Sequence, residues 1–168
     1  MRGVSTFDDL LAANQGYRVG YSDRGLEGRA ARGIAVVTCM DSRIEPLRML
    51  GLDLGDAKIM RNAGGRVTDD VLRTLVLATH LLGVERVLVV EHTECKMASA
   101  TDEQVHEQIL VSAGIDTRSL VFETMPDQLS SLAHDVQRVR SSPFLPPGLE
   151  VAGFLYDVRT GALTLTVP

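Results

Sequence analysis

The sequence predicts a single α/β domain with a central, mainly parallel β-sheet flanked by helices, and three observations support this fold class. Residues 34–38 (IAVVT), 57–61 (AKIMR) and 86–91 (RVLVVE) are short and apolar, as strands buried on both faces are. A helix-forming segment joins the second strand to the third through short connections. Strand–helix–strand units have right-handed crossovers, so the strands at the centre of the sheet should be parallel.

The N-terminal segment, residues 1–32, is predicted to be a helix followed by an arm, outside an α/β core of residues 33–168. Ser5 and Asp8 have the spacing of a capping box ahead of an apolar pattern that includes Leu10. The rest of the segment carries apolar side chains without a helical period. We expect this arm to lie over the domain or over a second subunit.

Two further helices and a hairpin complete the predicted core. Thr68 is placed to cap a helix that ends at Gly83, and its apolar residues recur at helical spacing. A second helix is predicted from Asp127 to Arg140, and residues 151–167 read as a β-hairpin. For residues 113–128 the sequence leaves two alternatives, a loop over the functional site or part of an interface.

Composition excludes several classes of protein. The chain has 168 residues, 45% of them hydrophobic, which suffices for the core of one domain. Its formal net charge is -5 and its basic residues are scattered, so a nucleic-acid partner is not expected. The sequence lacks the pattern of a secretory signal and any apolar run of about 18 residues, which predicts a cytoplasmic protein without a membrane partner. In a reducing compartment its two cysteines are candidates for metal binding or thiol chemistry.

Three candidate metal ligands should meet at one edge of the predicted sheet. Cys39 and His92 each directly follow a buried strand. The carboxyl ends of parallel strands share an edge, where neighbouring strands lie about 5 Å apart. Cys95 returns to the same place after a short turn. Two thiolates and one imidazole form a set of zinc ligands with a fourth position open for water or substrate.

Asp41 and Arg43 stand within four residues of Cys39. The carboxylate has two possible roles: it binds the metal as a fourth ligand, or it accepts a hydrogen bond from a zinc-bound hydroxide while Arg43 holds it through a bidentate pair. The structural alternative is a turn before a helix that starts at Ile44.

The motifs CMDSR (39–43), RNAGG (61–65) and HTEC (92–95) occur in this order, and together they resemble the β class of carbonic anhydrases, in particular its short bacterial members. The resemblance implies Zn²⁺ held by Cys39, His92 and Cys95, and reversible hydration of carbon dioxide to bicarbonate through a zinc-bound hydroxide. It also implies that Asp41 and Arg43 form an orienting dyad.

The same resemblance implies a substrate pocket shaped by Asn62, Ala63 and Gly64, and a homodimer in which the N-terminal helix reaches across the partner. Whether dimers pair into tetramers stays open.

The chain has no tryptophan, a residue that is carried by the family members that close in response to bicarbonate. Its absence favours the open state, in which Asp41 pairs with Arg43. Lys96 departs from the family, which usually has glycine there. Its side chain either points to solvent or lies near the metal edge.

Two other functions are compatible with the same candidate residues. One is a zinc hydrolase of a related small heterocumulene such as carbon disulfide, and the other is a non-catalytic zinc or thiolate sensor. The intact pair of Asp41 and Arg43 argues against the sensor, because a structural site does not need it. The remaining histidines, His80, His106 and His134, are predicted to be packing or surface groups and not ligands.

Overall fold

The computed structural model describes residues 6–168 and has the predicted α/β architecture. Its five-stranded sheet has the order β2-β1-β3-β4-β5, and only β5 runs antiparallel to its neighbour. The strands are β1 (Ile34–Cys39), β2 (Ala57–Asn62), β3 (Arg86–His92), β4 (Glu150–Tyr156) and β5 (Leu163–Val167). The prediction of a mainly parallel sheet with a C-terminal hairpin is therefore confirmed.

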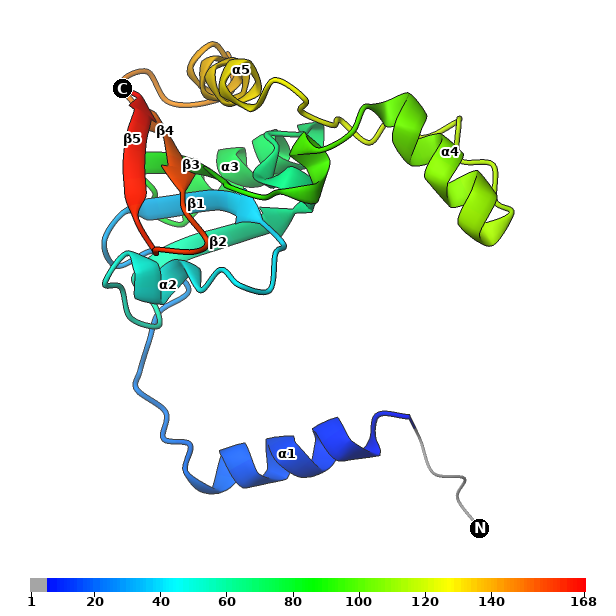
Figure 1. The fold of residues 1–168 in the computed structure, drawn as a ribbon. Coiled ribbons are helices and arrows are strands. Elements are labelled where there is room, and N and C mark those ends of the chain that lie inside the picture. Colours follow the sequence, from blue (N-terminus) through cyan, green and yellow to red (C-terminus); the bar gives the residue numbers. More distant parts are fainter. Residues whose placement is uncertain (1–5) are drawn as a thin grey trace.

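Helices cover both faces of this sheet (Figure 1). On one face, α3 (Asp69–Leu81) and α5 (Gln128–Arg140) pack against apolar side chains of β1 and β3 such as Val37 and Val89. On the other face, the short helix α2 (Pro46–Met49) and its neighbours pack against Val36 and Val90. Thr68 caps α3 as predicted, and Asp127 caps α5, because their side chains accept hydrogen bonds from the backbone amides of the first turns.

The two central strands end one residue later than the sequence suggested. Cys39 and His92 are the last residues of β1 and β3, whereas the sequence placed each just beyond its strand. β1 and β3 are direct neighbours, with Thr38 opposite Val90. The final residues of both strands therefore reach the same edge of the sheet.

Helix α4 (Asp102–Ala113) was not predicted, because it carries no apolar stripe. None of its residues is buried. A capping box of Thr101 and Gln104 begins the helix, and Gly114 ends it with a φ of 68°. Figure 1 shows α4 projecting away from the sheet. The chain then returns to the core, where Met125 is fully buried.

Helix α1 (Asp8–Val19) stands apart from the sheet in Figure 1, and none of its residues is buried. Ser5 of the predicted capping box lies outside the described residues. The chain joins the core at Ala30, whose amide donates a hydrogen bond to the carbonyl of Leu82. Within residues 6–168, no helix combines the length and the apolar character needed to cross a bilayer.

Candidate metal centre

The structure brings Cys39, His92 and Cys95 together at the carboxyl edge of the sheet. One ligand atom from each residue lies within 4.8 Å of the other two, and all three side chains are buried. The two sulfur atoms are 4.0 Å apart. Cys39 and His92 come from the ends of adjacent parallel strands, and Cys95 comes from the turn that follows β3.

The imidazole of His92 presents a free lone pair to this cluster. Its Nδ1 lies 2.8 Å from the carbonyl oxygen of Thr93, and because a carbonyl only accepts hydrogen bonds, Nδ1 carries the proton. Nε2 is then the unprotonated nitrogen of the neutral ring. It is buried and has no hydrogen-bond partner within the described residues. An orphaned nitrogen of this kind, oriented by a backbone carbonyl on the other side of the ring, is typical of a metal ligand.

The distances fit a tetrahedral zinc ion. Two sulfur ligands at about 2.3 Å from a tetrahedral centre lie about 3.8 Å apart, close to the observed separation of 4.0 Å. The two sulfur atoms share a hydrogen bond, and this contact lowers the pKa of Cys39 while it raises the pKa of Cys95. Cysteines bind a divalent cation as thiolates, so zinc binding here would release protons from this pair. The three residues therefore suit Zn²⁺ with one coordination position left open.

Hydrogen bonds to β4 and to α5 hold the turn that carries Cys95. Thr93 donates its amide to the carbonyl of Tyr156 and accepts from the amide of Val158, so the turn is attached to β4 and the residues after it. Gln128 of α5 donates to the carbonyl of His92 at 2.9 Å. Lys96 then begins a short 3₁₀ turn, and its side chain is exposed.

The RNAGG segment lies directly against the cluster because two of its residues have no side chain. A Cβ atom on Gly65 would lie 2.9 Å from the backbone nitrogen of Cys39, and the φ of Gly65 is 73°. Only glycine permits both this approach and this backbone conformation. Gly64 packs against Met97 and Met125, which belong to the same apolar cluster as Cys39 and Cys95.

Asp41 and Arg43 form a closely hydrogen-bonded pair beside the cluster. Oδ1 of Asp41 accepts from the amide and the Nε of Arg43, each at 2.9 Å, and Oδ2 accepts from Nη2 at 2.7 Å. Arg43 therefore holds the pKa of Asp41 well below its usual range. Oδ2 of Asp41 lies 3.9 Å from Nε2 of His92. The turn of the structural alternative is present, since the amide of Ile44 donates to the carbonyl of Asp41, but helix α2 begins at Pro46 and not at Ile44.

A comparison with protein-family models matches residues 34–163 to the family described as carbonic anhydrase. β-Carbonic anhydrase 1 of Mycobacterium tuberculosis is 36% identical over 165 residues, which cover 98% of this chain and all of that protein. The chain belongs to the β-carbonic anhydrase family. The fold agrees, because the crystal structure of a carbonic anhydrase from Streptococcus mutans matches with a TM-score of 0.90 at 37% identity, covering 97% of this chain and 98% of that one.

A second group of relatives is named carbon disulfide hydrolase. The carbon disulfide hydrolase of Acidithiobacillus thiooxidans is 31% identical over 152 residues, which cover 79% of this chain and 76% of that protein. The present chain therefore matches the mycobacterial β-carbonic anhydrase over a larger share of both proteins than it matches the hydrolase.

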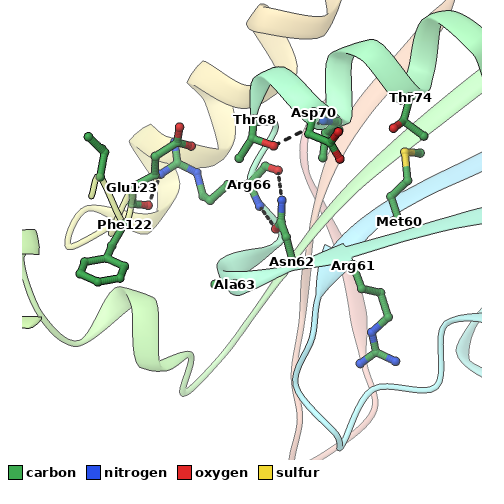
Figure 2. A pocket seen from close by; sticks show the side chains of 12 residues that line it. Met60, Arg61, Asn62, Ala63, Arg66, Thr68, Asp70, Thr74, Phe122 and Glu123 are labelled. Carbon is green, nitrogen blue, oxygen red and sulfur yellow. Dashed lines mark hydrogen bonds between the residues drawn. The ribbon is translucent and has the colours of Figure 1, made fainter. Parts of the chain in front are cut away.

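The predicted pocket residues separate into two places. Asn62 and Ala63 line a pocket of about 440 Å³ that also contacts Arg66 and Phe122 (Figure 2). Figure 2 also shows the Asn62 side chain closing the RNAGG turn, since it donates to the carbonyl of Arg66 and accepts from its amide. The metal candidates do not line this pocket. Gly64 instead lies beside them.

Sequence reasoning missed three charged residues around the cluster. Glu94 and Arg159 lie at its exposed rim, where both belong to a chain of ion pairs that includes Arg43. Glu91 is fully buried, and neither of its carboxylate oxygens has a hydrogen-bond partner within the described residues. Its place in the apolar run RVLVVE was the available signal, because buried carboxylates are rare in such strands.

The other histidines lie away from the cluster, as predicted. His80 contacts the carbonyl of Phe144, and His106 contacts Thr117. His134 is exposed on α5.

Proposed function

We propose that this protein hydrates carbon dioxide reversibly to bicarbonate and a proton, using a zinc ion held by Cys39, His92 and Cys95. The observation that carries the proposal is the buried, unpartnered Nε2 of His92, which faces two thiols and has the Asp41 carboxylate 3.9 Å away. The names of the relatives in M. tuberculosis and S. mutans support the same reaction.

Zinc, when bound, would supply a Lewis acid that lowers the pKa of its water and so makes it a nucleophile. The protein's own residues supply orientation. Arg43 keeps Asp41 ionised and fixes both of its oxygens, so the carboxylate is placed to accept a hydrogen bond from the attacking water and to orient it. The three hydrogen bonds between Asp41 and Arg43 support the open state, in which Asp41 is not a fourth metal ligand.

The test is carbon dioxide hydration by zinc-replete protein, measured beside Asp41→Ala. Asp116→Ala is a matched control, because Asp116 pairs with Arg118 through the same hydrogen bonds at an exposed position. We expect hydration by the wild type and the control, and a loss of about 10²-fold or more in Asp41→Ala with zinc content unchanged. Equal rates in the two variants would contradict the role of Asp41.

Assays on carbon disulfide separate the alternatives. Hydrolysis of carbon disulfide without hydration of carbon dioxide would identify a heterocumulene hydrolase, as the name of the A. thiooxidans relative suggests. Zinc binding with neither activity would identify a sensor. The longer match to the mycobacterial protein supports carbon dioxide as the substrate.

We propose further that the chain works as a homodimer in which α1 packs on the partner. The proposal is supported by the exposed apolar side chains of this helix, among them Leu10 and Leu11 at 61% and 60% exposure. Exposed apolar surface of this kind marks an interaction site. Light scattering should give twice the chain mass, and removal of residues 1–24 should give a monomer. A monomeric wild-type protein would contradict the proposal.

A further inference from the structure

The hydrogen bonds of Arg43 extend beyond Asp41 to a second carboxylate. Its Nη1 donates to Oε2 of Glu94 at 3.2 Å, while Nε and Nη2 are used by Asp41. Oε1 of Glu94 accepts in turn from Nε of Arg159, which lies in the turn between β4 and β5. Glu94 is therefore a bridge between two guanidinium groups, one beside the metal cluster and one on the hairpin turn.

Arg159 does not form the ion pair with a nearby aspartate that its local sequence would favour. The chain contains three Asp-x-Arg segments, and in two of them the guanidinium pairs with the aspartate two residues before it: Asp41 with Arg43, and Asp116 with Arg118. In the third, the amide of Arg159 still donates to Oδ1 of Asp157 at 2.7 Å, but its guanidinium turns to Glu94, 65 residues away in sequence.

The backbone of Glu94 also indicates a specific role. Its φ is 58°, in the left-handed region that side chains other than glycine rarely adopt. Within residues 6–168 it shares this property with one other residue that is not glycine, Glu123. A glycine would occupy the position without strain, and strained residues of this kind cluster at functional sites. Here the strained position lies between two metal-ligand candidates, His92 and Cys95.

We propose that Glu94 and Arg159 are positioning residues that fix Arg43, and through it the carboxylate of Asp41, against the metal cluster. This inference rests on the proposed function. The Arg43 side chain is 43% exposed, and its contact with Glu94 occupies the one nitrogen that Asp41 leaves free. Loss of that contact frees the guanidinium to rotate toward solvent, and Asp41 then loses its fixed orientation relative to Nε2 of His92.

The first test measures hydration kinetics of Glu94→Gln and Arg159→Gln. We expect each to lower kcat by about 3- to 10-fold with little change in KM, since binding of a small neutral substrate does not need the dyad. The double variant should be no slower than the slower single variant, because both changes break one chain of contacts. Arg159→Lys should retain more activity than Arg159→Gln. Arg118→Gln is the matched control and should leave kcat unchanged.

The second test does not depend on activity. In the metal-free protein, hydrogen exchange at Nε of Arg43, followed by NMR, should become faster in Glu94→Gln and Arg159→Gln but not in Arg118→Gln. Unchanged exchange overturns the inference, and so does a kcat equal to that of the control. If the wild type shows no hydration, the proposed function fails, and the exchange rates alone then decide whether Glu94 and Arg159 fix Arg43.

Discussion

Oδ2 of Asp41 lies 3.9 Å from Nε2 of His92, the buried ring nitrogen without a hydrogen-bond partner in residues 6–168. This separation leaves the nitrogen free for a metal and keeps the carboxylate close to the candidate metal cluster. The same aspartate is held on its other side by Arg43. The candidate metal ligand His92 and the proposed proton acceptor Asp41 are thus placed side by side by two different strand ends.

Replacement of Arg43 by lysine should lower turnover while zinc binding persists. Lysine keeps the positive charge but lacks the planar fork that holds both oxygens of Asp41. We expect Arg43→Lys to reduce kcat by about 10- to 100-fold. Stopped-flow hydration assays and metal analysis of the same sample check this. Turnover equal to the wild type would show that charge alone, and not orientation, is what Arg43 supplies.

A methyl group at Gly65 should disturb the cluster. It would lie 2.9 Å from backbone atoms of Thr38 and Cys39, neither of which is able to move without shifting the end of β1. We expect Gly65→Ala to lower the free energy of unfolding by about 2–4 kcal/mol and to weaken zinc binding. Denaturant titration and zinc competition with a chelator measure the two effects.

Gly114→Ala provides the matched control for this variant. Gly114 has a similar φ of 68° but open space around the added methyl group. It should cost about 1–2 kcal/mol through its backbone conformation and leave zinc affinity unchanged. If the two variants behaved alike, the close approach of Gly65 to Cys39 would have no bearing on the metal site.

Hydration activity should rise through the alkaline range. Two thiolates cancel the charge of a zinc ion, so this centre should acidify water less than one with three neutral histidines. Asp41 contributes no inflection there, because Arg43 depresses its pKa and the carboxylate stays ionised at every higher pH. The measurement is kcat at saturating buffer. A profile already flat from about pH 6.5 to about pH 9 would be inconsistent with this donor set.

Protein stability should fall as pH rises, because of Glu91. Burial, aided by the negative charge of Asp135, raises the pKa of Glu91 from 4.5 to about 8. Between these values the folded state binds more protons than the unfolded state, so the free energy of unfolding decreases with pH. The full effect amounts to about 3–5 kcal/mol.

Glu91→Gln should remove this dependence. Urea denaturation at several pH values between about 5 and about 8 should give a smaller slope of stability against pH for Glu91→Gln than for the wild type. Glu103→Gln, an exposed change on α4, serves as the control and should keep the wild-type slope. Parallel slopes in all three proteins would rule out a protonated Glu91.

The fold and the ligand cluster were predictable because they follow from strong local patterns. Strands buried on both faces are continuous apolar runs, and parallel strands bring residues such as Cys39 and His92 to one edge whatever lies between them. Helix α4 was missed because it buries no apolar stripe against the core, so periodicity gave no signal. Its remaining signals were the capping box at Thr101 and Gly114 at its end.

The ion pairs of Glu94 at the exposed edge of the candidate site were not predictable, for a different reason. Arg159 and Glu94 are 65 residues apart, and their contact depends on β4 lying beside β3, which the apolar pattern alone did not show. The hairpin of β4 and β5 was predictable from the sequence, but its place in the sheet was not. Ion pairs between exposed side chains leave no periodic trace in a sequence.

Zinc K-edge X-ray absorption of the zinc-replete protein, combined with metal analysis, tests the central claim most directly. We predict about one zinc per chain with two sulfur ligands at about 2.3 Å, one imidazole nitrogen at about 2.0 Å and one further light atom. A zinc shell without sulfur, or a protein that binds no zinc when Cys39 and Cys95 are reduced, would contradict the account.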